Sequence, residues 1–310
     1  MKKWILRSSA IVVILALFVI IIRPGILVGK PAIQSNAALL MDVNTGEVIM
    51  NMNGDVPLPT GSITKLMTQL IIMDELSAGH ISWEDQVEIS QNASEVEGQQ
   101  VALRPGDQVT VRELLEVVSV YSANDAIVAL AEHALGSEDV FIDRMNDKAK
   151  ELGLSVHTIY HNVTGNTSSA GGPTDNYMTA SDIALLSAHL IQEHPEILKM
   201  ASRPQVELKG KGLYMSNTNW MLEEISGPYS YEGVDGLRTG YTEEAGYCYA
   251  GTAEQNGKRL VAVVLGAESQ EQRFNEARDL LNYGYSHGYT TGGWHKQWAL
   301  ALRQAVDRTI

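Results

Sequence analysis

Residues 246–265, GYCYAGTAEQNGKRLVAVVL, give the clearest structural signal in the chain. Two apolar segments, Gly246–Ala253 and Leu260–Leu265, lie on either side of the dipeptide Asn256-Gly257. Asn-Gly favours the left-handed backbone of a tight two-residue turn, whose twist matches that of paired strands. The segment therefore predicts an antiparallel β-hairpin.

Sheet-forming segments also occur near the start of the chain. Ala37–Val43 and Glu47–Met50 are apolar runs joined by Asn44-Thr45-Gly46, which predicts a second hairpin. Helical spacing of apolar residues dominates from about residue 62 to residue 193. Three further strands are predicted at Arg203–Leu208, Leu213–Met215 and Leu237–Tyr241. A closing helix is predicted at Gln270–Tyr283. This order predicts one antiparallel sheet built from both ends of the chain, with a helical subdomain inserted.

Capping residues mark several helix boundaries in the middle of the chain. Thr110 and Glu113 form a capping-box pattern, and Thr179 and Asp182 repeat it. Ser137 is a further predicted helix start, because acidic residues follow it in the first turn.

Charge and cysteine content exclude two classes of function. The 310 residues include 23 basic and 37 acidic side chains, a formal net charge of −14 with histidine neutral. Such a charge repels phosphate backbones, so we expect no nucleic-acid partner. Cys248 is the only cysteine, which excludes an intramolecular disulfide and a zinc site of paired cysteines. Its apolar neighbours favour a buried side chain over a reactive thiol.

Residues 1–30 have the layout of a secretory signal. The apolar run Ala10–Ile22 follows the basic residues Lys2, Lys3 and Arg7. Because no small-x-small cleavage site follows, we favour an uncleaved signal anchor in the cytoplasmic membrane over a cleaved signal peptide, and both over a buried core helix. Residues 31–290 are then expected to fold in the cell envelope, on the extracytoplasmic face of that membrane.

Residues 291–310 predict an amphipathic tail helix. Its apolar face holds Trp294, Trp298, Ala301, Leu302, Ala305 and Val306. We favour a terminal helix that docks on the preceding domain, and a second membrane contact remains the alternative.

Three short motifs carry candidate chemistry, and the first is Ser62-Ile63-Thr64-Lys65. It places a serine at the start of an amphipathic helix and a lysine one turn later on the same face. A lysine whose pKa is lowered by burial or by a second cation can take the proton of the serine hydroxyl. Backbone N–H groups of the helix N-terminus can face an oxyanion. Alone, the pattern is also typical of an ordinary helix start.

The second motif, Ser122-Ala123-Asn124, lies at a break between two predicted helices. A hydroxyl there can relay a proton, and a carboxamide can hold a peptide-like substrate. Ser90-Gln91-Asn92 has the same spacing, but its polar surroundings predict a surface loop. We therefore favour Ser122 over Ser90.

The third motif, Arg238-Thr239-Gly240-Tyr241, lies on a predicted strand. Arg238 offers a fixed cation to an anionic substrate terminus, and Gly240 lets a substrate backbone approach the strand. On its own, the arginine is more typical of a solvent-exposed edge strand.

A metal site is the alternative to consider for His157 and His161, which are four residues apart. Their β-branched segment lacks a glutamate, and strand-like spacing puts both on one face without a third ligand. We therefore predict neither a metal nor another cofactor.

Together the three motifs resemble those of the penicillin-binding D-alanyl-D-alanine carboxypeptidases, members of the serine β-lactamase and penicillin-binding-protein superfamily. The signatures of that family are Ser-x-x-Lys, Ser-x-Asn and Lys-Thr-Gly in this order, and Arg238 stands in the place of the last lysine. The resemblance spans about residues 36–288. It implies a β-lactamase/transpeptidase-like α/β (α+β) fold for residues 31–290, with a five-stranded antiparallel sheet, flanking helices and an inserted all-helical subdomain.

The resemblance also implies roles in acyl transfer. Ser62 is expected to be the acylated nucleophile, with Lys65 as its general base. Ser122 is expected to relay the proton toward the leaving amine. Water then hydrolyses the acyl-enzyme.

Substrate binding follows from the same resemblance. Asn124 is expected to hold the substrate amide, and Arg238 with Thr239 to bind the terminal carboxylate. Gly240 lies where the substrate backbone approaches. The backbone N–H groups of Tyr241 and of the nucleophile are expected to form the oxyanion hole.

The implied activity is that of a serine-type carboxypeptidase of cell wall biogenesis, which removes the terminal D-alanine from peptidoglycan stem pentapeptides. β-Lactam antibiotics are expected to acylate the same serine, and the protein is expected to be a monomer. A β-lactamase is one alternative, although the chain has no Glu-x-x-Leu-Asn segment for a class A deacylating glutamate. A catalytically impaired peptidoglycan-binding module is the other.

Overall fold

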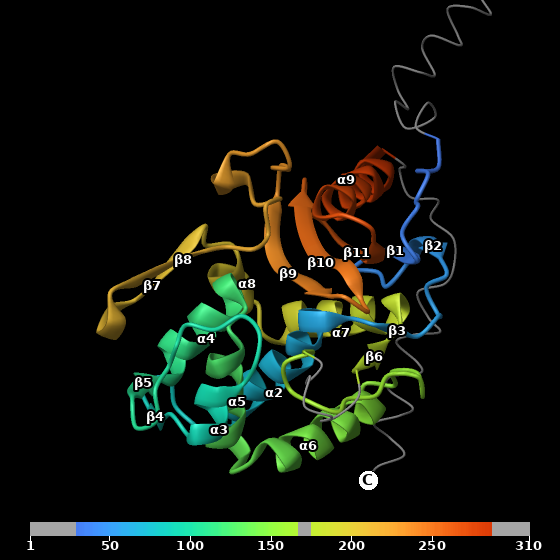
Figure 1. The fold of residues 1–310 in the computed structure, drawn as a ribbon. Coiled ribbons are helices and arrows are strands. Elements are labelled where there is room, and N and C mark those ends of the chain that lie inside the picture. The colour runs from blue at the N-terminus through green and yellow to red at the C-terminus, as the bar shows by residue number, and fades with distance from the viewer. Residues whose placement is uncertain (1–28, 167–174, 287–310) are drawn as a thin grey trace, which may run out of the picture.

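Both predicted hairpins belong to one central sheet. A computed structural model describes residues 29–166 and 175–286, and its five-stranded antiparallel sheet has the order β2-β1-β11-β10-β9. The strands are β1 (Ala37–Asp42), β2 (Val48–Met52), β9 (Val234–Thr242), β10 (Gly246–Gln255) and β11 (Lys258–Ala267). Figure 1 shows β1 from the start of the chain beside β11 from its end. The predicted sheet is therefore confirmed.

The turn between β10 and β11 has the predicted left-handed geometry. Asn256 and Gly257 have φ angles of 52° and 75°, and Gln255 pairs with Lys258 across the turn. β1 then pairs with β11 in register, with Leu39 opposite Val263. All six residues of β1 are buried, because helices cover both faces of the sheet at this point.

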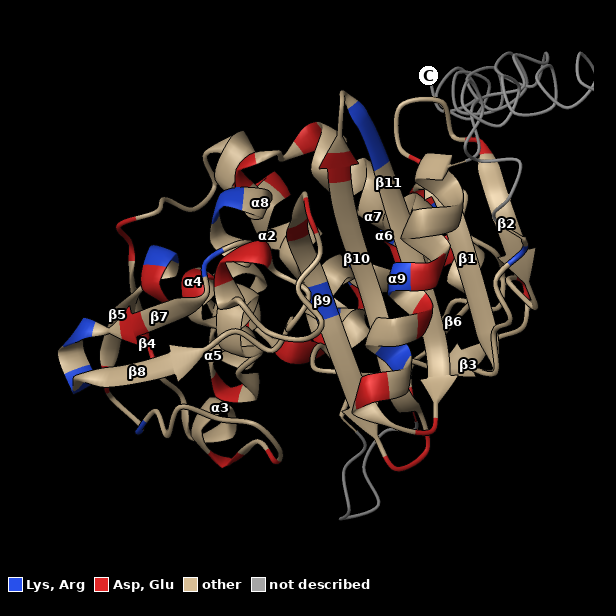
Figure 2. Ribbon diagram, turned by 90° about the horizontal axis from the view of Figure 1, so that it is seen from above, with Lys and Arg blue, Asp and Glu red and all other residues tan. Residues whose placement is uncertain are grey.

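The helices divide into two groups around the sheet. Figure 2 shows α9 lying across one face, with the five strands side by side beneath it. On the other face α7 contacts β1 and β11, and the helical subdomain lies beyond it (Figure 1). The helices are α2 (Lys65–Ala78), α3 (Gln91–Glu95), α4 (Val111–Tyr121), α5 (Asn124–Leu135), α6 (Glu138–Glu151), α7 (Ala180–Glu193), α8 (Glu196–Ala201) and α9 (Gln270–Ser286).

The predicted caps are present. Thr110 and Glu113 make both hydrogen bonds of a capping box at the start of α4. The Ser137 side chain accepts from the N–H of Val140 at the start of α6. Thr179 does the same for Asp182 at the start of α7.

The structure differs from the sequence predictions in three places. The first α-helix begins at Lys65, because Gly61–Thr64 forms the 3-10 turn η2. Ser90 caps the short helix α3, its Oγ accepting from the Ala93 N–H, so its segment is not a simple loop. The strands β7 (Gln205–Leu208) and β8 (Leu213–Ser216) pair only with each other, outside the central sheet.

The structure also contains two short strand pairs that the sequence did not predict. They join β3 (Leu58–Pro59) to β6 (Tyr177–Met178), and β4 (Gln86–Glu88) to β5 (Gln108–Thr110).

Two predictions fall outside the described residues. They are the export signal, except for its last two residues, and the tail helix over 291–310. Between residues 29 and 286, as far as these are described, every helix is too short or too polar to cross a bilayer.

Candidate active site

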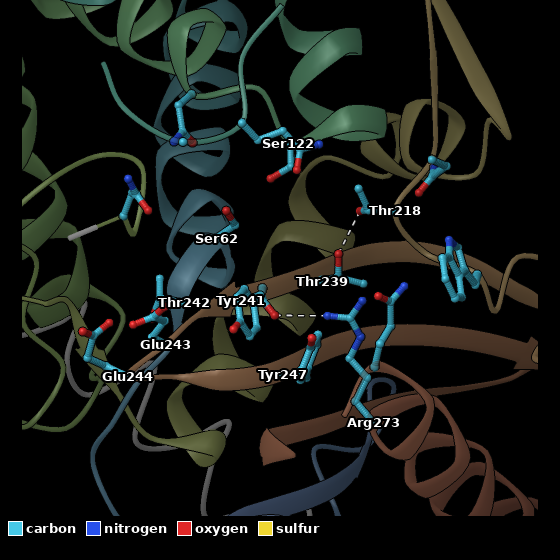
Figure 3. Close-up of a pocket in the computed structure, with 18 of the residues that line it drawn as sticks. Ser62, Ser122, Thr218, Thr239, Tyr241, Thr242, Glu243, Glu244, Tyr247 and Arg273 are labelled. Carbon is cyan, nitrogen blue, oxygen red and sulfur yellow. Dashed lines mark hydrogen bonds between the residues drawn. The ribbon is translucent and has the colours of Figure 1, made fainter. Parts of the chain in front are cut away.

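A cleft of about 1060 Å³ opens along β9. Its walls come from segments far apart in the sequence: η2, the loop after α3, the α4–α5 junction, residues 216–220, the β9–β10 turn and the start of α9. The lining includes Ser62, Ser122, Asn124, Thr239, Gly240 and Tyr241. All three sequence motifs therefore contribute to one cavity (Figure 3), whereas Ser90 lies outside its lining.

Ser62 and Lys65 form the chemical centre of the cleft. Lys65 is fully buried, and its Nζ donates hydrogen bonds of 2.8 Å to Ser62 Oγ and 2.8 Å to the Thr164 carbonyl. Burial first, and the cation of Arg238 second, hold the pKa of Lys65 well below its usual range. A lysine that gives up its proton readily, next to a hydroxyl, can act as a general base.

The lowered pKa of Lys65 predicts the pH dependence of acylation. An amine accepts a proton only in its neutral form, so with Lys65 as the base the rate should be highest above this pKa and should fall as the pH falls through it. Removing the Arg238 charge, as in Arg238→Gln, should raise the pKa and move this fall to higher pH. Labelling rates with a fluorescent penicillin across the pH range measure both profiles. Identical profiles would contradict the electrostatic coupling.

Close backbone packing places Ser62 against β9. A Cβ on Gly61 would lie 3.0 Å from the backbone nitrogen of Tyr241, and one on Gly240 would lie 2.5 Å from the Thr60 carbonyl oxygen. Only glycine allows the turn and the strand to approach this closely. The approach brings Tyr241 beside Ser62 (Figure 3).

A turn after the helical subdomain holds the carbonyl that binds Lys65. Asn162 Oδ1 accepts from the N–H groups of Thr164 and Gly165, at 3.1 and 2.6 Å. Asn176 Nδ2 donates to the Asn162 carbonyl at 2.9 Å and so ties the turn to the next segment. Sequence reasoning assigned these residues no role, although Asn-x-Thr-Gly is a recognisable Asx-turn pattern.

The second motif occupies the junction of α4 and α5. Ser122 ends α4 in a left-handed conformation, with φ of 68°, so its hydroxyl leaves the helix and faces the cleft (Figure 3). Asn124 begins α5, and its Nδ2 donates to the Glu97 carbonyl at 2.6 Å. Asp125 is fully buried and accepts from the N–H of Leu103 at 3.0 Å. The loop between α3 and β5 is thereby held beside Asn124.

Arg238 occupies a different place from the one that the sequence predicts. It is 3% exposed and is not among the described residues that line the cleft. Its guanidinium donates to Ser122 Oγ at 3.0 Å, to Gln69 Oε1 at 2.6 Å and to the Val118 carbonyl at 3.0 Å. Burial lowers its pKa to about 9, so it is cationic at neutral pH. The cation thus lies behind Ser122, outside the described lining of the cleft.

A second arginine, which sequence reasoning missed, does line the cleft. Among the described lining residues Arg273 on α9 is the only cation. Its Nη1 donates to the Gly240 carbonyl at 3.1 Å, while its buried Nε has no partner in the described structure. Figure 3 shows its side chain on the same side of the cleft as Thr239 and Thr218. Thr239 Oγ1 and Thr218 Oγ1 are 2.8 Å apart.

The remaining candidate residues do not assemble a further site. Cys248 is buried, and burial raises the pKa of its thiol to about 11. The segment around His157 and His161 is irregular except for a single bridge between Ile159 and Tyr177. In the described ranges no three His, Cys, Asp or Glu side chains are grouped so that they could hold a metal ion.

Comparison with known proteins identifies relatives of this domain. A family model for D-alanyl-D-alanine carboxypeptidases, Peptidase_S11, matches residues 26–269. D-alanyl-D-alanine carboxypeptidase DacF of Bacillus subtilis (strain 168) is 36% identical over 267 residues, which is 85% of this chain and 65% of the relative. DacC of Escherichia coli (strain K12) is 36% identical over 264 residues, 83% of this chain and 63% of the relative. The chain therefore spans less than two thirds of these two relatives.

Solved structures agree with this assignment. D-alanyl-D-alanine carboxypeptidase DacD from Francisella tularensis has a TM-score of 0.76 at 29% identity, over 84% of this chain and 72% of that one. Penicillin-binding protein D2 from Listeria monocytogenes, in its ampicillin-bound form, has a TM-score of 0.73 at 32% identity. That match covers 83% of this chain and 99% of the Listeria chain.

Proposed function

The chain belongs to the D-alanyl-D-alanine carboxypeptidase family, and from this premise we propose that it removes the terminal D-alanine from peptidoglycan stem pentapeptides through an acyl-enzyme on Ser62. The observation that carries the proposal is the 2.8 Å contact between Ser62 Oγ and the buried amine of Lys65. A hydroxyl and a base in this arrangement are what nucleophilic acyl transfer needs. The ampicillin-bound form of the Listeria relative supports β-lactam binding in this cleft, and we propose that Ser62 is the residue acylated.

Acylation begins when neutral Lys65 accepts the proton of Ser62 Oγ. The oxygen attacks the carbonyl carbon of the penultimate D-alanine, and the negative charge moves to the carbonyl oxygen. Backbone N–H groups of Ser62 and Tyr241 stabilise that oxyanion. The Ser122 hydroxyl delivers its proton to the amide nitrogen and receives in return the proton that Lys65 took from Ser62, so that the C–N bond breaks and D-alanine leaves. Water then attacks the ester and gives a proton to neutral Lys65, and this proton returns to Ser62 Oγ as the shortened peptide leaves.

The free edge of β9 orients the substrate. β9 is the last strand of the central sheet, so its outer edge can pair with an extended peptide. Asn124, 3% exposed in the cleft wall, holds the peptide amide from the opposite side. Attack by Ser62 then occurs between the strand and the α4–α5 junction.

Arg273 and Thr239 recognise the terminal carboxylate in this account, in place of Arg238. Burial lowers the pKa of Arg273 to about 10, so it is cationic at neutral pH. Its planar guanidinium can pair with a carboxylate, and it is one of the residues that line the cleft, with 5% of its surface exposed.

Arg273→Ala is expected to lower kcat/KM for a D-alanyl-D-alanine peptide by about a hundredfold, as for a lost charge-assisted hydrogen bond. The loss should be much smaller for the same peptide with a C-terminal carboxamide. Arg278→Ala is the matched control, since Arg278 lies on the same helix and outside the cleft lining. Equal losses on both peptides would place carboxylate recognition elsewhere.

The proposed function is tested with the full chain and two substrates. D-alanine release from a lysyl-D-alanyl-D-alanine peptide should exceed hydrolysis of benzylpenicillin, which should remain bound as a slowly hydrolysed adduct. Faster turnover of penicillin than of peptide would favour the β-lactamase alternative. Absence of both D-alanine release and adduct would favour the impaired binding module.

The proposed place of action is the extracytoplasmic side of the bacterial cytoplasmic membrane. The substrate class belongs to the cell wall, and the sequence of residues 1–30 has the layout of an export signal. Membrane anchoring through that segment is part of the proposal.

A further inference from the structure

A ladder of buried polar groups lies behind Ser122. Gln69 is on α2, one turn after Lys65, and is 2% exposed. Its Oε1 accepts from Arg238 Nη2 at 2.6 Å, and its Nε2 donates to Ser119 Oγ at 2.8 Å. Ser119 Oγ in turn donates to the Leu115 carbonyl at 2.7 Å.

The ladder fixes the orientation of the Gln69 carboxamide. The hydroxyl hydrogen of Ser119 is used on the Leu115 carbonyl, so its oxygen is left to accept. Gln69 must therefore present its NH₂ group to Ser119 and its oxygen to Arg238. If the amide were flipped, its oxygen would face Ser119 Oγ and its NH₂ group would face the Arg238 guanidinium. Neither pair could form a hydrogen bond, and unpaired polar groups are costly in a buried site.

The orientation of Gln69 determines where the Arg238 guanidinium points. Nη2 is held by Gln69 and by the Val118 carbonyl. Because the guanidinium is planar and rigid, this leaves Nη1 directed at Ser122 Oγ, 3.0 Å away. A guanidinium can only donate, so Ser122 Oγ accepts and keeps its own hydrogen for another partner.

We propose that Gln69 is a positioning residue for acyl transfer: its carboxamide aims Arg238 at Ser122, so that the Ser122 hydrogen points into the cleft, toward the leaving nitrogen. This role rests on the proposed function of the site. A polar contact is needed at this depth because Arg238 is a buried cation, and without Gln69 only the Val118 carbonyl would hold its Nη2.

The neutrality of Gln69 has a second consequence. All three groups that accept hydrogen bonds from Arg238 are uncharged, so the field of the cation reaches Lys65, whose pKa it lowers in addition to burial. A glutamate at position 69 would keep an acceptor in place but would offset that charge.

Two variants of the full chain test the role, with labelling by a fluorescent penicillin as the readout. Gln69→Met removes the acceptor while keeping the side-chain length, and should slow acylation about tenfold to a hundredfold, the scale of a misplaced catalytic group. In Gln69→Glu, the fall of the acylation rate at low pH should occur at a higher pH than in the parent chain. This second change tests whether the charge at position 69 acts on Lys65 through the pair with Arg238. Gln192→Met is the control for the substitution itself, because Gln192 lies on α7, outside the cleft lining, where its Nε2 donates to the Val43 carbonyl.

The outcomes separate the inference from the proposed function. Slower labelling in Gln69→Met, a shifted profile in Gln69→Glu and a parent-like Gln192→Met support the positioning role. Parent-like labelling in Gln69→Met, or an unshifted profile in Gln69→Glu, overturns it while the parent still releases D-alanine. A parent chain that neither takes up penicillin nor releases D-alanine overturns the proposed function and this role with it.

Discussion

Lys65→Ala is expected to slow acylation of Ser62 by about a hundredfold to ten-thousandfold, the usual scale for removing a general base. The serine would keep its place, because η2 is held against β9 by backbone packing at Gly61 and Gly240. It would lose the group that accepts its proton, and the remaining cation at Arg238 cannot accept one. The measurement is the rate of fluorescent penicillin labelling at saturating and limiting concentrations.

A control lysine distinguishes loss of the base from general damage. Lys148→Ala removes the 2.6 Å ion pair with Asp74 on the helical subdomain and leaves the lining of the cleft intact. It should label at close to the parent rate. Near-normal labelling in Lys65→Ala would mean that another residue is the base.

Gly165→Ala is expected to destabilise the fold by about 3 kcal/mol and to slow acylation at least about a hundredfold. Gly165 has φ of +79°, and a Cβ there would lie 1.8 Å from the carbonyl oxygen of Gly61. That atom belongs to the backbone, so no side chain can rotate to relieve the clash. The turn would have to move, and the Thr164 carbonyl would move away from Lys65. Chemical denaturation and penicillin labelling measure the two effects.

Gly153→Ala is the matched control for backbone strain alone. Gly153 also has a left-handed φ, +68°, but a Cβ there would meet nothing within 4 Å. The substitution should cost only about 1 kcal/mol and leave acylation unchanged. If Gly165→Ala is no more harmful than Gly153→Ala, the close packing of the Thr164 turn on η2 does not matter to the site.

Local signals account for what the sequence predicted correctly. Asn256-Gly257 determines its own turn, and Thr110 with Glu113 determines the start of α4, because each depends on neighbours within a few residues. The convergence of the three motifs came from the resemblance to a known family, since nothing in the spacing of Ser62 and Ser122 dictates that they share a cleft.

The two arginines show where sequence reasoning reaches its limit. Successive residues of a strand point to opposite sides, so Arg238 and Thr239 are not suited to grip one carboxylate together. Thr239 faces Thr218 in the cleft, and Arg238 turns toward α2 and α4. Arg273 reaches the cleft only because α9 packs on β10, and no local pattern marks that contact.

The strands β7 and β8 were predicted correctly as strands but not in their pairing. Both alternate buried and exposed residues over part of their length. Such alternation predicts strands with one buried face, but it does not predict which strand each one pairs with. Contacts with α4 cover one side of it, and such long-range packing is not readable from the segment itself.

The central claim is that Ser62 is the acylated nucleophile, and peptide mapping tests it most directly. The full chain is incubated with benzylpenicillin, digested, and analysed by mass spectrometry, in parallel with Ser62→Ala. We expect one penicilloyl adduct, on the peptide that contains Ser62, and neither adduct nor D-alanine release in Ser62→Ala. An adduct on Ser90 or Ser122, or D-alanine release that survives in Ser62→Ala, would contradict the account.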